Sequence, residues 1–285
     1  MAIVFDGIVF GLQLSLLAVG LTMIYGLGGV LNLAHGQFVT VAAIIGAVLL
    51  RGELPVLVVL AVAVTSAGVL ALVVDASLMR PVYRLHGEQR VLLSLLLTLG
   101  AAFLIDGILI YYHPLTALNL SVPGALSVEI LGVRMRSASV AASIIAIVVL
   151  VGLIVFLRYA RLGKAIRSII EDEEGAKLVG INPASIRTLV FVMSGLLAGL
   201  VAVTQGLISS VSATDGINFT ILALIVTVVG GLGKVSGSLV AGLLLGIIHA
   251  FASFYIGAFV TFVILLLAAI ITILVRPSGI LGKAA

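Results

Sequence analysis

Carboxylates gather at one place in the sequence, the run from Glu171 to Glu174. Small and large apolar residues follow at once, at Ala176, Leu178, Val179 and Ile181. This pattern predicts a short helix lying along a membrane surface, with acidic residues at the N-terminal end where they complement the helix dipole. Gly180 provides a stop and Pro183 prevents continuation. A solvated loop is the alternative, which composition alone favours.

The carboxylates have no partners with which to form a hydrolytic or metal site. No Ser/His/Asp arrangement or His-x3-His spacing appears where a sheltered site could form, and the lack of Cys excludes thiolate chemistry. The stretch around Lys234 resembles a phosphate-binding loop only superficially: Val228 replaces the first glycine, and Val235 replaces the Ser or Thr after the lysine. A membrane-embedded enzyme is therefore disfavoured, and we expect this chain to bind no nucleotide and no metal.

Glycines interrupt the apolar sequence between residues 26 and 36, a stretch that includes Asn32, His35 and Gly36 and is followed by Gln37. Glycine permits non-helical backbone, and such backbone survives at membrane depth only where protein or water covers it. The polar side chains are candidates for lining a polar path or for bonding freed backbone groups. A tight turn between helices, with His35 at the interface, is an equally good alternative.

A second glycine cluster, Gly230, Gly231 and Gly233, lies in the opposite half of the chain. Short apolar segments of about 13 residues, or about 20 Å of helix, adjoin both clusters. Paired short segments are typical of the discontinuous helices of transporters. The glycines precede one short segment and follow the other, so the sequence does not establish an inverted repeat.

Ionisable residues inside apolar segments are few. Asp75 falls at a segment end, Asp106 about 9 Å from one, and His249 nearer a middle. A charge at the bilayer centre costs at least about 2.5–3.5 kcal/mol, so ion-driven carriers keep such groups for function. Nearly all segment middles are aliphatic, which indicates that the energy for any transport comes from elsewhere. Asp106 is more simply bonded near the interface than part of a relay, and His249 is more simply a packed histidine.

These residues are embedded in a chain of 285 residues that is 62% hydrophobic and 9% charged. Soluble domains carry about 25% charged residues, so this composition excludes them. Alternating strand patterns are absent, which argues against a barrel. The sequence predicts an all-α membrane bundle of about 8 (range 8–10) transmembrane segments with Gly-broken helices, forming a single domain over residues 1–285. Nine apolar segments are recognisable, at roughly 7–25, 37–50, 54–75, 91–112, 138–158, 188–208, 217–229, 238–256 and 258–275.

Small residues recur at the four-residue spacing of close helix packing in membranes. The pairs are Gly7 and Gly11, Gly195 and Gly199, and Gly242 and Gly246. Chance in a Gly-rich chain is an equal alternative.

Basic residues set the orientation. They concentrate in loops 76–90 and 158–187 and in the C-terminal tail, which the positive-inside rule places in the cytoplasm. Loop 113–137 then lies outside, although it contains two arginines, and the N-terminus lies outside if every segment crosses. The net charge of +4 reports this topology and not nucleic-acid binding. Asp6 stands where a signal peptide would be basic, so the first segment is expected to be retained.

The sequence Glu174-Gly-Ala-x3-Gly180 is similar to the E-A-A-x3-G motif of permease subunits in ATP-binding-cassette importers. Residues 20–37 resemble the N-F-A-H-G region of branched-chain amino acid permeases, and residues 227–242 resemble their G-G-x-G-x3-G region. The resemblance extends over almost the whole chain, which is thereby identified as a member of this permease family. Gly175 departs from the motif's Ala, which lowers helix propensity by about 1 kcal/mol.

The resemblance implies that loop 158–187 contains a coupling helix that docks into a groove of an ATPase subunit. The implied coupling residues are Glu171, Asp172, Glu174, Gly175, Ala176 and Gly180. The candidates for the translocation path are Asn32, His35, Gly36, Gln37, Gly230, Gly231 and Gly233.

The implied assembly contains two ATPase subunits that hold ATP and Mg²⁺, a second permease subunit (homologous or identical) and an extracytoplasmic substrate-binding protein. It is expected in the cytoplasmic (inner) membrane of a prokaryote. The family transports leucine, isoleucine and valine, while close relatives carry urea, short amides or other amino acids. An ion-coupled carrier or channel remains the alternative of another class.

Overall fold

The computed structural model describes residues 1–52, 54–113, 120, 127–130, 133–276 and 278–281. Most of the expected outer loop, residues 114–119 and 121–126, lies outside the described residues. In the described part, seven helical spans are long and apolar enough to cross a membrane, and two apolar helices are shorter. The predicted polytopic helical bundle is therefore confirmed, and the short helices are two of the nine predicted segments.

The long spans contain α1 (Ala2–Gly28), α3 (Val56–Val74), α5 (Gly87–Tyr112), α6 (Ser137–Tyr159), α9 (Pro183–Ile208), α11 (Val235–Tyr255) and α12 (Ala258–Val275). A π-helical turn, η1 (Asp75–Met79), and the short α4 (Arg80–Val82) extend α3 to a span of Val56–Val82. The shorter helices are α2 (His35–Leu50) and α10 (Gly216–Gly230). Helices α7 (Arg161–Glu171) and α8 (Glu173–Leu178) lie between α6 and α9, and strands β1 (Ser127–Ile130) and β2 (Val133–Arg136) pair antiparallel. This hairpin was not predicted.

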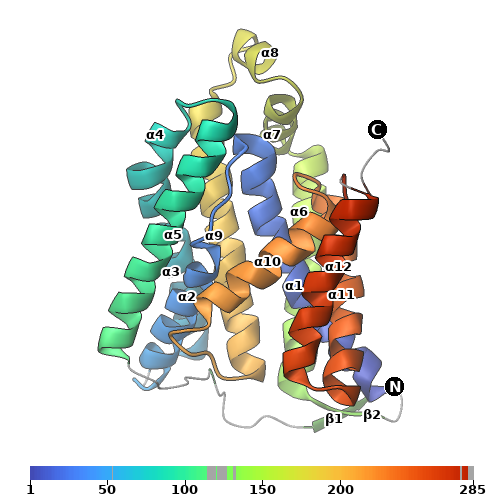
Figure 1. Ribbon diagram of the computed structural model, residues 1–285. Coiled ribbons are helices and arrows are strands. Elements are labelled where there is room, and N and C mark those ends of the chain that lie inside the picture. Colours follow the sequence, from blue (N-terminus) through green and yellow to red (C-terminus); the bar gives the residue numbers. More distant parts are fainter. Residues whose placement is uncertain (53, 114–119, 121–126, 131–132, 277, 282–285) are drawn as a thin grey trace.

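Two halves of the chain repeat one order of helices in opposite directions. The first half runs α1, a non-helical break, α2, α3 and α5; the second runs α9, a break at residues 209–215, α10, α11 and α12. In Figure 1 each helix of the second half points opposite to its counterpart across the bundle. A break thus precedes the short helix in both halves. The sequence reading, which placed the second break only after the short segment, was wrong on this point.

The halves pack through equivalent seams of small residues. A Cβ built on Gly11 of α1 would lie 2.9 Å from the Cα of Leu243 on α11. The counterpart seam joins α9 to α3, where a Cβ on Gly199 would lie 2.8 Å from the Cα of Val64. Backbones approach this closely only where side chains are absent, as in small-x3-small packing. All three glycine pairs therefore mark helix contacts, since Gly242 and Gly246 face α1 in the first seam, and chance is excluded at these positions.

Buried hydroxyls tie α1 to the second half within this apolar core. The Thr22 hydroxyl lies 2.5 Å from that of Ser238 on α11 and 3.3 Å from that of Thr227 on α10. Thr227 also donates to the carbonyl of Ala18. All of these side chains are fully buried, so each hydroxyl finds its partner inside the protein.

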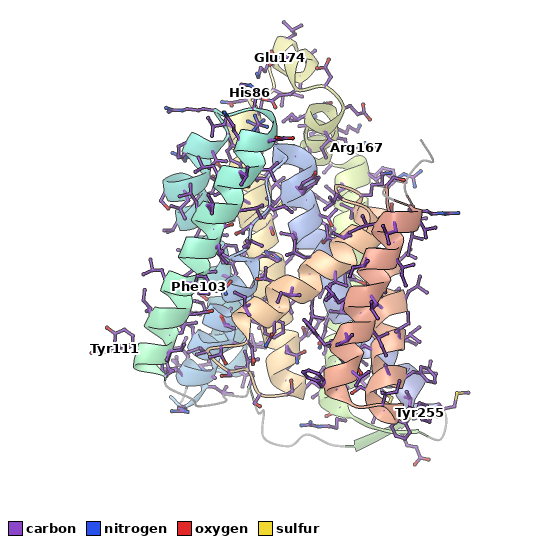
Figure 2. All side chains as sticks on the ribbon, in the orientation of Figure 1. His86, Phe103, Tyr111, Arg167, Glu174 and Tyr255 are labelled. Atoms are coloured by element: carbon purple, nitrogen blue, oxygen red, sulfur yellow. The ribbon has the colours of Figure 1, made fainter. Side chains whose placement is uncertain are left out.

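The two ends of the bundle differ in character. His86, Arg167 and Glu174 lie at one end, together with α8 and the C-terminus, while Tyr111 and Tyr255 lie at the other, with the N-terminus (Figures 1 and 2). The three segments predicted to be cytoplasmic therefore share one end. Between the ends, large apolar side chains such as Phe103, which is 61% exposed, point outward, as expected of a surface in contact with lipid.

Candidate functional site

Helix α8 projects beyond the end of the bundle (Figure 1). Asp172, in an extended conformation, separates it from α7 and caps it: its Oδ1 accepts the Glu174 N–H at 3.1 Å. At the other end, Gly180 has φ +84°, and the Ile181 N–H donates to the carbonyl of Ala176. A helix with the predicted acidic start and glycine stop is therefore present, and the solvated-loop alternative is wrong. Its position along a membrane surface stays a prediction.

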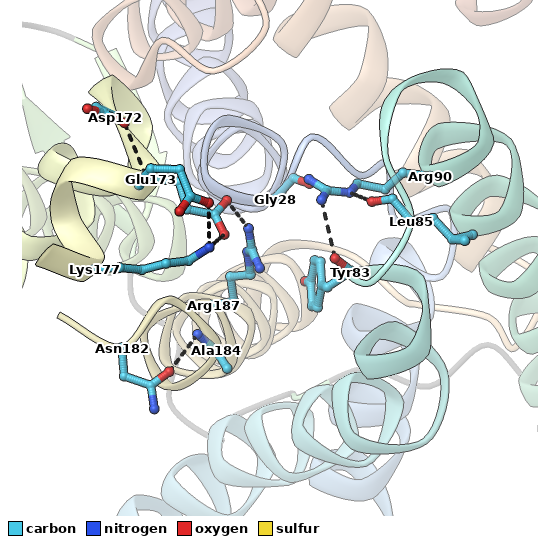
Figure 3. Close-up of polar contacts among 11 residues, drawn as sticks. Gly28, Tyr83, Leu85, Arg90, Asp172, Glu173, Lys177, Asn182, Ala184 and Arg187 are labelled. Atoms are coloured by element: carbon cyan, nitrogen blue, oxygen red, sulfur yellow. Dashed lines mark hydrogen bonds and ion pairs between the residues drawn. The ribbon is translucent and has the colours of Figure 1, made fainter. Parts of the chain in front are cut away.

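A chain of contacts anchors α8 to the bundle (Figure 3). Glu173 forms an ion pair with Arg187 of α9, and the Arg187 guanidinium lies 4.9 Å from the centre of the Tyr83 ring. Burial raises the pKa of Tyr83, so the phenol stays neutral at physiological pH. Arg187 is only 7% exposed. The helix is thus held by its inner side, through a cation–π contact and a charge-assisted hydrogen bond.

The outer side of α8 is left free. The Glu174 side chain is 81% exposed and bonds Lys177 at 2.6 Å. Leu178, the last residue of α8, is 89% exposed, and Val179, which follows it, is 76% exposed. Apolar side chains standing next to charges outside the bundle make a surface that a protein partner can cover.

The predicted coupling residues lie in different surroundings, and their part in docking stays a prediction. Glu171 is exposed at the last position of α7, and Ala176 is buried against the bundle. Gly175 faces the cap, because a Cβ there would lie 2.5 Å from Asp172 Oδ2. The sequence reading named neither Leu178 and Val179 as the exposed apolar pair nor Glu173 and Arg187 as the anchor. The sequence did carry a signal for this surface, because the apolar residues Leu178 and Val179 stand directly before Gly180.

The first break enters the bundle between α1 and α2, and hydroxyl side chains satisfy its backbone. Leu31 N–H donates to Ser94 Oγ at 3.3 Å, and Leu33 N–H donates to Thr98 Oγ1 at 3.0 Å, both on α5. Asn32 Oδ1 accepts the Ala34 N–H at 3.0 Å. Neighbouring helices therefore cover this irregular backbone, as membrane depth requires.

The two short helices begin side by side. Gly36 N–H donates to Thr220 Oγ1 at 2.9 Å, and the same oxygen lies 3.0 Å from the carbonyl of Leu33. A Cβ on Gly36 would lie 1.9 Å from the carbonyl oxygen of Gly216, the first residue of α10. Gly216 and Thr220 were not predicted as site residues, although the polar run 212–216 before the short segment carried the signal.

The polar residues in and directly after the break fall into two environments, with His35 and Gln37 in the first turn of α2. His35 is fully buried, with Nε2 3.1 Å from the Leu17 carbonyl and Nδ1 3.4 Å from Ser194 Oγ, so it bridges α1 and α9. Gln37 instead faces α5, where its Nε2 lies 3.4 Å from each carboxylate oxygen of Asp106. Among the described residues, neither Gln37 Oε1 nor Asn32 Nδ2 has a hydrogen-bond partner, although both atoms are buried. Their role in a path remains a prediction.

The second glycine cluster lies elsewhere, at the end of the bundle that carries α8. A Cβ on Gly231 would lie 2.6 Å from the Ser278 carbonyl oxygen, and one on Gly230 would lie 2.5 Å from backbone atoms of Gly237 and Ser238. Gly233 contacts Gly26 in the last turn of α1, just before the first break. These glycines therefore allow the turn after α10 to pack against α1 and the C-terminal segment, apart from Asn32 and Gln37.

The fold and the two breaks define a multi-span membrane protein with an inverted repeat. Residues 3–275 match the family described as branched-chain amino acid transport system, permease component. The chain belongs to this family.

Two relatives match this chain over nearly their whole length, and a third matches over part of it. The high-affinity branched-chain amino acid transport system permease protein BraD of Pseudomonas aeruginosa is 31% identical, over 98% of this chain and 94% of its own. LivH of Escherichia coli strain K12, which has the same description, is 29% identical with the same coverage. The ribose import permease protein RbsC of Escherichia coli is 31% identical over 33% of this chain and 31% of its own.

A solved structure titled PsaBC from Streptococcus pneumoniae in complex with Fab has a similar fold. The TM-score is 0.52 at 14% identity, over 96% of this chain and 91% of that one. This likeness extends to the arrangement of helices and no further.

Proposed function

We propose that this chain is the permease subunit of an ATP-binding-cassette importer and that α8 is its docking helix for an ATPase subunit. The observation that carries the proposal is the two-sided construction of α8. Glu173 and Arg187 hold one side to the bundle, while Glu174, Leu178 and Val179 stand free on the other. A helix that is anchored to the bundle on one side and exposed on the other can transmit movement of a bound partner to the membrane spans.

Membership in the permease family supports the same function. The aliphatic middles of the spans support it as well, because they leave few groups for proton or sodium coupling. On this proposal two ATPase subunits hold ATP and Mg²⁺, and a second permease subunit and an extracytoplasmic binding protein complete the importer in the inner membrane. The Arg187 contact would pass movement of α8 to α9, the helix that packs on α3 and α1.

The docking role is tested by ATP hydrolysis in the reconstituted complex. Glu174→Lys combined with Leu178→Asp should abolish substrate-stimulated hydrolysis, because it reverses a charge and removes an apolar contact on the free side. Glu129→Lys is the matched control, since Glu129 is exposed in β1 at the opposite end. Normal stimulation in the double variant would refute docking through α8.

We propose leucine, isoleucine and valine as the substrates, on the strength of the family and of the relatives' descriptions. The complex, reconstituted with its ATPase and binding-protein partners, should accumulate one of these amino acids without an imposed ion gradient. Accumulation of urea or a short amide instead would correct the substrate and leave the mechanism intact. Accumulation that needs a proton gradient and ignores ATP would overturn the mechanism.

A further inference from the structure

A cationic cavity of about 640 Å³ lies between α4 and the first turns of α9, next to the base of α8. Arg80 and Arg84 line one side, and Ser185, Arg187 and Thr188 line the other, with the Tyr83 ring between them. Three guanidinium groups therefore surround one space, together with two hydroxyls. A negatively charged group entering it gains charge-assisted hydrogen bonds.

The guanidinium groups are not fully used by contacts within the protein. Arg187 gives one terminal nitrogen to Glu173, but its Nε is buried without a hydrogen-bond partner in the described part of the chain. Arg80 and Arg84 are exposed, and neither forms an ion pair with a described residue. The carboxylate behind the cavity, Asp75, is fully buried and accepts the Thr188 hydroxyl at 2.6 Å. Two carboxylates, Asp75 and the Glu173 that pairs with Arg187, stand against three arginines, so the cavity keeps a net positive charge.

The position of the cavity along the spans indicates what enters it. Arg80 lies in the last turn of the span Val56–Val82, and Thr188 lies in the second turn of the span Pro183–Ile208. The cavity is therefore at the level where a membrane's hydrocarbon ends and its headgroups begin. Farther along the same span, α3 exposes Val69, Leu72 and Val73, which suit contact with acyl chains. Basic pockets between spans on the cytoplasmic side fit lipid phosphates.

We propose that this cavity binds the phosphate of an anionic phospholipid headgroup. Arg80 and Arg84 attract the phosphate, the Ser185 hydroxyl supplies a donor, Arg187 adds positive charge at the wall, and the acyl chains lie along α3. Arg187 lines the cavity and also forms the ion pair with Glu173 that Figure 3 shows, so a bound headgroup and helix α8 both interact with the same guanidinium. An acidic segment of an ATPase partner is the competing occupant, but the depth of the cavity at the span ends favours lipid.

Lipid retention by the purified permease tests the proposal. The protein is extracted in mild detergent, supplied with phosphatidylglycerol or phosphatidylcholine, and examined by native mass spectrometry and by thermal unfolding. We expect phosphatidylglycerol to be retained and to raise Tm, and phosphatidylcholine to do neither. Arg80→Gln with Arg84→Gln should weaken retention about tenfold or more, since each basic residue near the surface contributes about 1 kcal/mol. Arg158→Gln with Arg161→Gln, two exposed arginines at the same end, is the matched control.

The outcomes separate the possible sources of the anion. If inorganic phosphate alone raises Tm as much as phosphatidylglycerol does, the site takes free phosphate and the lipid assignment falls. Equal lipid retention in the two double variants overturns the proposal. If retention is equal but Arg80→Gln with Arg84→Gln loses association with the ATPase, the occupant is an acidic segment of the partner.

Discussion

The first turn of α2 rests on the first turn of α10 through two glycines, Gly36 and Gly216. A Cβ on Gly36 would lie 1.9 Å from the Gly216 carbonyl oxygen and 2.7 Å from the Thr220 backbone nitrogen. The two short helices thus start from one point, where the opposed halves of the chain meet. Neither helix can shift along the other without opening this contact.

Gly36→Ala should destabilise the permease strongly. The added methyl group meets the backbone of α10 at both Gly216 and Thr220, so relief requires the two short helices to separate. Overpacking of this kind typically costs about 1–3 kcal/mol, and a backbone neighbour places it at the upper end. The measurement is Tm in detergent. Gly100→Ala on α5 is the control, because a Cβ there has nothing within 4 Å. Equal Tm values for the two variants would contradict the contact.

Thr220→Val should cost stability by a different route. It preserves the shape of the side chain but removes the oxygen that accepts the Gly36 N–H at 2.9 Å. A buried donor left without a partner costs about 1–3 kcal/mol. Thr220→Ser keeps the hydroxyl and should lose less. The measurement is the Tm of both variants in detergent. If the Val variant is as stable as the Ser variant, the hydrogen bond from Gly36 N–H to Thr220 does not contribute to stability.

Gly175 and Asp172 should be energetically coupled. Gly175→Ala raises helix propensity by about 1 kcal/mol, but its methyl group displaces the Asp172 carboxylate and weakens a cap of similar value. The substitution should therefore change α8 little in the natural chain and should stabilise it once Asp172→Ala has removed the cap. Hydrogen exchange of the amides in residues 173–178 measures this, and strictly additive effects would rule the coupling out.

Helix α8 should loosen in alkali. The hydrogen bond to Glu174 raises the pKa of Lys177, so the ion pair contributes fully below the ordinary Lys pKa of about 10.4 and is lost as pH rises through the raised value. Glu174→Gln should lower the Lys177 midpoint in an NMR titration. Glu171→Gln, which removes the same charge without touching Lys177, should leave it in place. Equal Lys177 midpoints in the two variants would show that the Glu174–Lys177 ion pair does not raise the pKa of Lys177.

If the first break and the first turn of α2 line or gate the path, a cysteine at Gln37 in that turn should report movement. Gln37 is fully buried, and the natural chain has no Cys. Gln37→Cys should therefore react with a polar thiol reagent during ATP turnover and resist it at rest. Leu178→Cys, at an 89% exposed position, should react in both states. Inertness of Gln37→Cys under turnover would assign the break to packing alone.

The sequence predicts the long spans well because each is a continuous apolar stretch that lipid and backbone hydrogen bonding force into helix. It also predicts the short helix α8, whose cap and stop are local signals. The second break escaped prediction because residues 209–215 look like an ordinary loop until Gly216 is seen against Gly36. The anchor of Glu173 on Arg187 escaped for the same reason: it joins residues from separate helices, which no spacing in the sequence reveals.

The seam between α1 and α11 has a consequence for synthesis. Thr22 and Ser238, whose hydroxyls meet, are 216 positions apart in the chain. At about 5–20 residues per second, roughly 10–40 s pass between the emergence of one and of the other. During that interval α1 is already in the membrane with its glycine face and buried hydroxyls uncovered. The newborn first helix therefore needs a temporary companion, whether lipid or insertion machinery, until the ribosome delivers its permanent one.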